Sequence, residues 1–90
     1  MVGYNSLMTT AKKVEIYSTP NCHFCHMAKD YFREKGVEFT DHNVASDTAK
    51  RAEMLDISGQ MGVPVIVIDQ KDLVIGFNKP VLAKLLEIEE

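Results

Sequence analysis

The feature that most constrains this chain is a short strand that turns directly into a helix and carries both cysteines. Residues 14–17 are mostly apolar or β-branched, and the stretch that follows contains Pro20, Cys22 and Cys25. The N–H groups of a helix's first turn have no partner inside the helix and lie at the positive end of its dipole, so a thiolate there is stabilised. We therefore expect Cys22 to be an exposed nucleophile, with Cys25 one turn on and close enough to form a disulfide with it.

Composition limits the classes of protein to which the chain can belong. Its 90 residues, 46% of them hydrophobic, suffice for one small domain. A net charge of −3 lacks the basic excess that binds nucleic-acid phosphates. No run approaches the roughly 18 apolar residues that span a membrane, and the first ten residues do not resemble a secretory signal. We therefore expect a cytoplasmic monomer without nucleic-acid or membrane partners. In a small cytosolic protein, two cysteines are more often catalytic or metal-binding than structural.

The remaining pattern predicts a single α/β domain over residues 13–90, preceded by a flexible extension over residues 1–12. Hydrophobic periodicity and turn residues mark each element. The expected strands cover residues 14–18, 37–44, 65–68 and 73–75. The expected helices cover about 23–35, a segment that follows a cap at Ser46 or Asp47 and runs to about Ile57, and a last segment after Asn78. The order βαβ-α-ββ-α predicts a four-stranded mixed sheet flanked by three helices.

The helices have faces that can be assigned from spacing alone. In the first helix an apolar stripe should face the core, and it contains Cys25, Ala28, Tyr31 and Phe32. The charged residues of that helix should face solvent, namely Lys29, Asp30, Arg33 and Glu34. The apolar faces of the other two helices should consist of Ala49, Ala52, Met54 and Leu55, and of Val81, Leu82, Leu85, Leu86 and Ile88.

Three motifs together resemble the glutaredoxin branch of the thioredoxin fold. They are the stretch of residues 17–25 with its Cys-x-x-Cys pair, Gly62-Val63-Pro64, and Gly76-Phe77. The likeness covers the chain from about Val14 onwards, and it extends to small bacterial glutaredoxin-like proteins and to the redoxins that supply electrons to ribonucleotide reductase. It implies a thioredoxin-like fold with a cis peptide bond before Pro64, which should face the cysteines.

The resemblance also implies a thiol–disulfide oxidoreductase that reduces disulfides in proteins or mixed disulfides with glutathione. Cys22 should attack the target disulfide and Cys25 should resolve the mixed disulfide. The backbone of Val63 should pair with the substrate as a short added strand. Glutathione, as co-substrate, should contact Phe24, Val63, Pro64, Gly76, Phe77 and Asn78.

The sequence departs from the glutaredoxin pattern at positions that usually bind glutathione. Thr19 stands where a lysine usually meets the glycyl carboxylate, and Ile75-Gly76 and Asn78-Lys79 replace a Gly-Gly and an Asp-Asp arrangement. One alternative is therefore a dithiol redoxin that is recharged by thioredoxin reductase and binds little glutathione. Another is a module that holds a [2Fe–2S] cluster between two subunits.

Two further alternatives involve metals and use the same cysteines. Residues 22–26 match the C-x-x-C-H signature of haem attachment, and the two cysteines with a histidine, joined by His42, could ligate zinc. The preceding strand and the Val63-Pro64 pair favour redox chemistry, so we expect no metal or haem. His23 and His26 should then lie partly exposed near the thiolate, which they would stabilise when protonated.

Overall fold

The computed structural model describes residues 12–87, so Ile88 and, apart from Lys12, the predicted N-terminal extension lie outside the described residues. The elements along the chain are β1 (Val14–Ser18), α2 (His23–Glu34), β2 (Thr40–Asn43), α3 (Thr48–Ser58), β3 (Val65–Ile68), β4 (Asp72–Ile75) and α4 (Lys79–Leu86). The predicted order βαβ-α-ββ-α is confirmed. No helix among residues 12–87 is long and apolar enough to cross a membrane.

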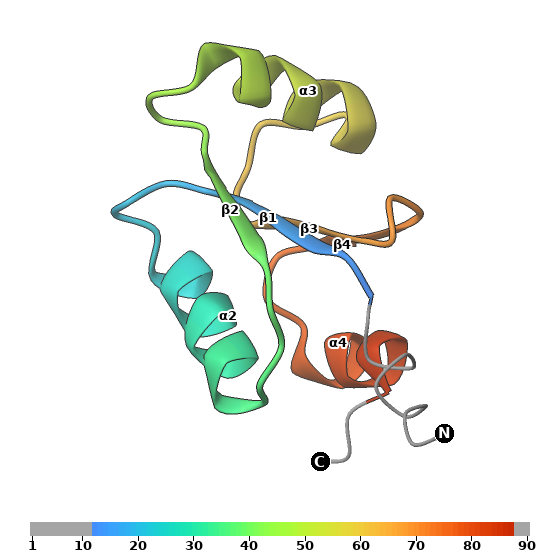
Figure 1. The fold of residues 1–90 in the computed structure, drawn as a ribbon. Coiled ribbons are helices and arrows are strands. Elements are labelled where there is room, and N and C mark those ends of the chain that lie inside the picture. The colour runs from blue at the N-terminus through green and yellow to red at the C-terminus, as the bar shows by residue number, and fades with distance from the viewer. Residues whose placement is uncertain (1–11, 88–90) are drawn as a thin grey trace.

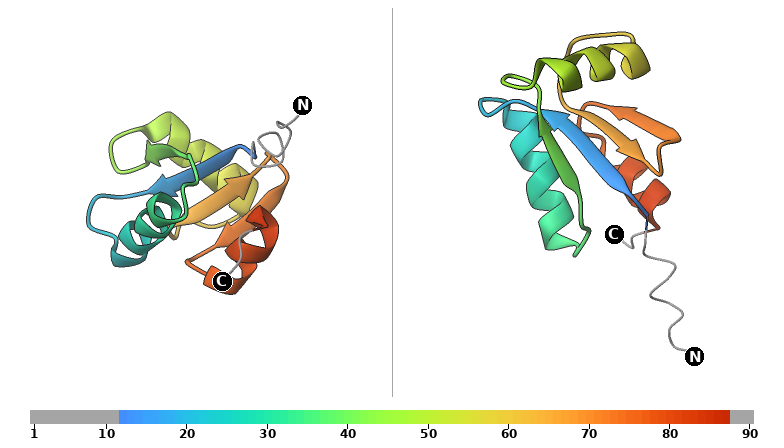
Figure 2. Two further views of the ribbon diagram at one scale, coloured as in Figure 1. Left: turned by 60° about the horizontal axis from the view of Figure 1, so that its bottom comes forward. Right: turned by 45° about the horizontal axis from the view of Figure 1, so that its top comes forward.

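The four strands form one mixed sheet in the order β2-β1-β3-β4. β1 is parallel to β2 and antiparallel to β3, and β3 is antiparallel to β4. Helices α2 and α4 cover one face of the sheet, whereas α3 covers the other (Figures 1 and 2). Because β1 is paired on both sides, the end of β1, where the chain turns towards the cysteines, is held by a strand on each side.

The larger hydrophobic core lies between the sheet and the layer formed by α2 and α4. Phe32 on α2 and Ile16 on β1 are fully buried in it, and the ring centroid of Phe32 lies 5.4 Å from that of Phe39. A smaller cluster on the α3 side contains Tyr17 and Met54. The central strand β3 is apolar on both faces because helices cover both faces of the sheet.

The ends of the helices follow the expected capping chemistry. Asp47 precedes α3 and its side chain accepts a hydrogen bond from the backbone N–H of Lys50 at 3.1 Å. Asn78 caps α4 in the same way. Gly36, just beyond α2, has a φ of 72°, a left-handed conformation that glycine adopts without strain.

Three details of the predicted elements are wrong. β2 spans only Thr40–Asn43, because the preceding residues Val37 and Phe39 pack against the core without pairing as strand. On α3 only Met54 is buried, and its predicted neighbours Ala49, Ala52 and Leu55 are exposed. On α4 the exposed Val81 is replaced in the core by Ala83.

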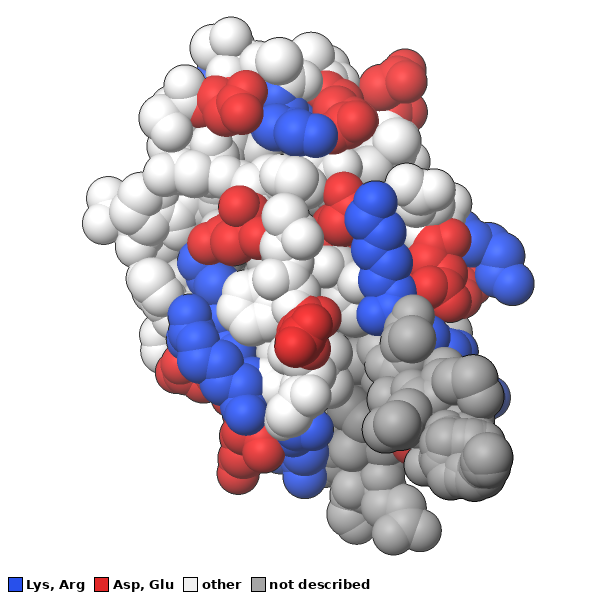
Figure 3. Space-filling view, viewed as in Figure 1, with Lys and Arg blue, Asp and Glu red and all other residues white. Residues whose placement is uncertain are grey.

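Acidic and basic side chains are interspersed over the face of the molecule drawn in Figure 3. Two ion pairs lie within single helices, Arg33 with Asp30 at 3.1 Å on α2 and Lys50 with Glu53 at 3.0 Å on α3. These pairs are largely solvent-exposed, so each contributes little to stability.

Candidate active site

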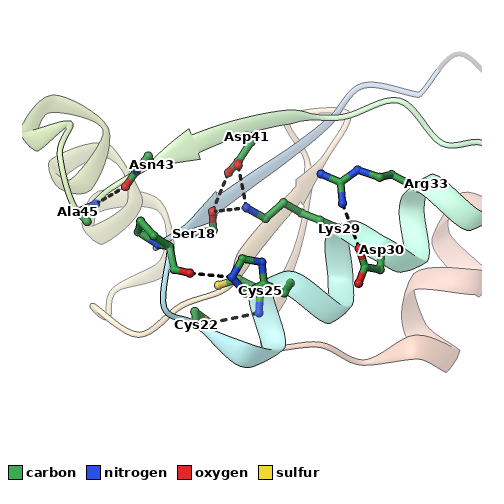
Figure 4. Close-up of polar contacts among 11 residues, drawn as sticks. Ser18, Cys22, Cys25, Lys29, Asp30, Arg33, Asp41, Asn43 and Ala45 are labelled. Carbon is green, nitrogen blue, oxygen red and sulfur yellow. Dashed lines mark hydrogen bonds and ion pairs between the residues drawn. The ribbon is translucent and has the colours of Figure 1, made fainter.

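The Cys22 side chain caps the helix that carries both cysteines. Its backbone is extended, and its Sγ accepts a hydrogen bond from the backbone N–H of Cys25 at 3.1 Å (Figure 4). Serine, threonine, aspartate or asparagine usually occupies this capping position. The sulfur therefore lies at the N-terminal, positive end of the dipole of α2.

The turn before the helix is tied to the first turn of α2. The backbone N–H of Cys22 donates to the carbonyl oxygen of Thr19 at 3.3 Å, and Nε2 of His26 donates to the carbonyl oxygen of Pro20 at 2.6 Å. The side chains of His23 and His26 are both exposed, as the sequence predicted. The chain entering the helix is thus fixed by contacts on both sides of Cys22.

The two free cysteines differ in exposure. Cys22 is partly exposed, whereas Cys25 is 0% exposed and shares the buried stripe of α2 with Ala28 and Phe32. Burial raises the pKa of Cys25 to about 12, and the hydrogen bond with Cys22 and its negative charge act in the same direction. The backbone N–H of Thr19 and the charge of Lys29 oppose this rise in pKa. Cys25 is therefore a protonated thiol at neutral pH.

We expect iodoacetamide at pH 8 to alkylate Cys22 long before Cys25 in the reduced protein. A thiol with a pKa of about 12 is ionised to only about one part in ten thousand at pH 8, and labelling of Cys25 should rise as the pH approaches 12. Peptide mass mapping after a short incubation measures the two sites separately. In urea both cysteines should react alike, and equal labelling of the folded protein would contradict the assignment.

Lys29 was predicted to face solvent, and this prediction is wrong. The residue is only 8% exposed, and its Nζ donates to Asp41 Oδ2 at 2.8 Å and to Ser18 Oγ at 3.3 Å. The Ser18 hydroxyl in turn donates to Asp41 Oδ1 at 2.6 Å (Figure 4). Lys29 follows Cys25 by four residues, so both lie on one side of α2.

Lys29, Ser18 and Asp41 form a cluster that joins α2 to β1 and β2. The cluster also determines the ionisation state of the Asp41 carboxylate. Partial burial alone would raise the pKa of Asp41, but the hydrogen bonds from Lys29 and Ser18 and the charge of the lysine outweigh it and lower the pKa. Asp41 is therefore ionised at neutral pH, opposite an ionised lysine. Sequence reasoning missed all three residues, although the spacing between Cys25 and Lys29 was an available signal.

The Val63–Pro64 peptide bond is cis, as predicted. Pro64 is buried, and its carbonyl oxygen accepts a hydrogen bond from the backbone N–H of Gly76 at 2.8 Å. Gly76 has a φ of 85°, which a residue with a side chain rarely adopts. Two of the three segments that carry the family resemblance are therefore in direct contact.

The other predicted glutathione contacts occupy different surroundings. Phe24 is 56% exposed at the start of α2. Phe77, just before α4, is half-buried, and its ring centroid lies 5.8 Å from that of Tyr31 on α2. Val63 is half-buried, and the side chain of Asn78 accepts a hydrogen bond from the backbone N–H of Val81 at 3.3 Å. The aromatic contact thus ties the start of α4 to the helix that carries the cysteines.

Among residues 12–87, two surface hollows of similar size are not lined by either cysteine. One of about 230 Å³ is lined by Glu15, Tyr17, Glu53, Ile57, Val67, Gln70, Lys71 and Leu73. The other, of about 250 Å³, is lined by Met27, Asp30, Tyr31, Glu34, Phe77 and Lys79. Only the second includes a predicted glutathione contact, Phe77.

Within residues 12–87, no three His, Cys, Asp or Glu side chains gather where they could hold a metal ion. His42, the fourth ligand in the zinc alternative, lies on β2 with its Nε2 3.0 Å from Glu15 Oε1 and its ring 4.9 Å from that of Tyr17. The zinc alternative is therefore not supported by the geometry of these residues.

Comparison with known proteins agrees with this architecture. The Glutaredoxin family model matches residues 14–73. A glutaredoxin-like 8.6 kDa protein in the rubredoxin operon of Clostridium pasteurianum is 47% identical over 74 residues, which cover 82% of this chain and 97% of that protein.

Solved structures show the same likeness. A variant of the thioredoxin-like protein BC3987 has a TM-score of 0.79 and 32% identity, over 84% of this chain and 96% of that one. The NrdH-redoxin of Escherichia coli has a TM-score of 0.70 and 26% identity, over 81% of this chain and 93% of that one. These structures confirm the thioredoxin-like fold. With the family match over residues 14–73 and the paired cysteines at the start of α2, the chain belongs to the glutaredoxin family.

Proposed function

We propose that this protein is a glutaredoxin-type thiol–disulfide oxidoreductase that uses Cys22 and Cys25 to reduce disulfides in proteins or mixed disulfides with glutathione. The observation that carries the proposal is the capping contact between Cys22 Sγ and the backbone N–H of Cys25, with Cys25 itself buried. Members of the family are generally thiol–disulfide oxidoreductases. A partly exposed sulfur at a helix start, with a second sulfur close by, suits that chemistry.

The proposed cycle has two exchange steps. The Cys22 thiolate attacks one sulfur of the target disulfide, forms a mixed disulfide and releases the other sulfur as a thiolate. Cys25 then loses its proton and attacks Cys22, which forms the Cys22–Cys25 disulfide and releases the second half of the target. Two electrons pass from the protein to the target, and a thiol donor must return them. The potential expected for a glutaredoxin is about −200 to −230 mV.

Glutathione is the donor that family membership favours, since glutaredoxins use it as co-substrate. The contact between Pro64 and Gly76 gives a fixed surface beside which glutathione or a substrate peptide would extend along Val63. Exposed Phe24 would provide an apolar wall on the other side. Phe77 and Asn78 complete the proposed binding set.

The alternative is a dithiol redoxin that thioredoxin reductase recharges. The related NrdH-redoxin of Escherichia coli is described as a glutaredoxin-like protein with a thioredoxin-like activity profile. Thr19, which stands where a lysine charge would meet the glycyl carboxylate, favours the same alternative. In either case we propose a cytoplasmic monomer that acts on disulfide-containing proteins.

A coupled assay distinguishes the two donors. We expect glutathione with glutathione reductase and NADPH to sustain reduction of a mixed disulfide substrate at least tenfold faster than thioredoxin reductase with NADPH, because the family's donor is glutathione. NADPH consumption is the readout, and Cys22→Ser is the blank. Turnover with thioredoxin reductase alone would support the redoxin alternative.

Thr19→Lys introduces the lysine that this position usually carries in glutaredoxins. It should lower the KM for the glutathione substrate if the glycyl carboxylate of glutathione lies beside residue 19.

A further inference from the structure

The second step of the proposed cycle poses a problem that the capping contact does not solve. Cys25 must become a thiolate although it is completely buried and shielded from water. Ionising a thiol in such a place is unfavourable unless a positive charge or a hydrogen-bond donor is near. The following inference rests on the proposed function, because it concerns how this step is made possible.

The charged groups around Cys25 come from two elements. Those that act on Cys25 itself are Cys22, the N-cap of α2, and Lys29 on that helix. Asp41 on β2, with His42 beside it, faces Lys29. Of these groups, only Lys29 is a cation that acts directly on the Cys25 thiolate in a stabilising sense. The backbone N–H of Thr19, the residue after β1, acts in the same sense.

A lysine as deeply buried as Lys29 is uncommon unless it is paired. Here Nζ is held from two sides, by Asp41 Oδ2 at 2.8 Å and by Ser18 Oγ at 3.3 Å. Ser18 directly precedes Thr19, so the ammonium is fixed next to the segment whose backbone N–H faces the Cys25 sulfur. An exposed ion pair on α2, such as Arg33 with Asp30, would hold the helix without bringing charge to the cysteines.

We propose that the buried Lys29 ammonium stabilises the Cys25 thiolate as this sulfur attacks the mixed disulfide on Cys22, and that Asp41 and Ser18 hold the ammonium in place for this step. Lys29 is thus a positioning residue that acts through Cys25 and does not touch the substrate. The contribution of Lys29 is greatest in the mixed disulfide. There Cys22 carries no negative charge, so the positive charge of Lys29 acts on the Cys25 thiolate alone.

The step balances without a further reactant. Cys25 gives up its thiol proton, which ends on the departing substrate sulfur, and attacks Cys22 Sγ. The bond between Cys22 and the substrate sulfur breaks, and the substrate leaves as a thiolate that takes up one proton. Neither member of the ion pair accepts the proton, because Lys29 is already protonated and the Asp41 carboxylate is held in its ionised form. The pair therefore acts by its charge alone.

The test uses one equivalent of Ellman's reagent on the reduced full chain in a rapid-mixing experiment. Attack by Cys22 releases a first nitrothiobenzoate, and resolution by Cys25 releases a second. We expect Lys29→Met to leave the first release unchanged and to slow the second about threefold to tenfold at pH 7, with the midpoint of its pH profile raised by up to about one unit. The matched control is Lys35→Met, an exposed lysine just beyond the same helix, which should behave as the parent does.

A second variant separates charge from structure. Asp41→Asn removes the negative counter-charge but keeps an amide oxygen that can accept from Lys29 Nζ, so the ammonium stays in place. The second release should then be faster than in the parent, although the protein loses stability in urea. A merely structural role would slow Asp41→Asn and Lys29→Met alike, and that result would overturn the inference. It would equally be overturned by a parent-like rate and pH profile in Lys29→Met. If Lys29→Met does not fold, a second release in Asp41→Asn that is no faster than in the parent would overturn the inference.

The same experiment keeps the inference distinct from the function on which it rests. If the parent releases only one nitrothiobenzoate, the dithiol cycle itself is wrong. If the parent releases two, the dithiol cycle is supported, and the rates of the variants then show whether Lys29 contributes to the second step.

Discussion

Replacing Cys22 with serine should abolish disulfide reduction, with a loss of a thousandfold or more, down to about the background rate. A serine hydroxyl at the same N-cap position would keep the helix capped, since serine is a good N-cap residue. The variant should therefore fold normally while lacking the sulfur that attacks the target. Turnover of a disulfide substrate with an excess of dithiol donor is the measurement, and far-UV circular dichroism checks the fold.

Cys25→Ser should behave differently from Cys22→Ser. The first attack should proceed at the rate of the parent, because Cys22 and its capping contact with the backbone N–H of residue 25 remain. Resolution should fail with substrates that need two thiols, although a mixed disulfide with glutathione can still be released by a second glutathione. Full activity in Cys22→Ser, or an inert Cys25→Ser, would reverse the roles assigned to the two sulfurs.

Phe32→Ala should destabilise the domain by about 3–5 kcal/mol, the usual cost of removing a large buried aromatic side chain. Phe32 is completely buried between α2 and the sheet, and its ring contacts Tyr31 and Phe39. A domain of this size has a total stability of only about 5–15 kcal/mol. The variant is therefore expected to lose a large part of its folding free energy, measured as a lower urea midpoint with a similar slope.

The matched control for this loss is Phe24→Ala on the same helix. Phe24 is 56% exposed, so its removal should change the stability by less than about 0.5 kcal/mol. Comparable losses in the two variants would show that α2 does not pack on the sheet by the stripe that contains Phe32. This pair of variants tests the packing that holds Cys25 and Lys29 in place.

Local signals predicted the parts of the fold that depend on neighbouring residues. Pro20, the cysteine spacing and Gly36 mark the two ends of α2, and the apolar run of β3 and the Asn78 cap mark later elements. Because these features act within a few residues, they can be read from the sequence. The cis bond before Pro64 was implied by the family resemblance and not by any local pattern.

Tertiary packing decided the features that the sequence did not reveal. A charged residue such as Lys29 is usually expected to face solvent. In the fold, however, Lys29 pairs with Asp41, which lies on β2, the strand that runs parallel to β1. Such a partner is visible only once the strands are in register. The exposed Leu55 on α3 has a similar cause, since this helix packs on the sheet mainly through Met54.

The account depends most on which sulfur bonds to the substrate, and mass spectrometry of trapped intermediates measures this directly. Cys25→Ser and Cys22→Ser are each incubated with a disulfide substrate and quenched in acid. We predict a stable mixed disulfide on Cys22 in the first variant and no adduct on the buried Cys25 in the second. A substrate adduct that forms on Cys25 as rapidly as on Cys22 would contradict the account.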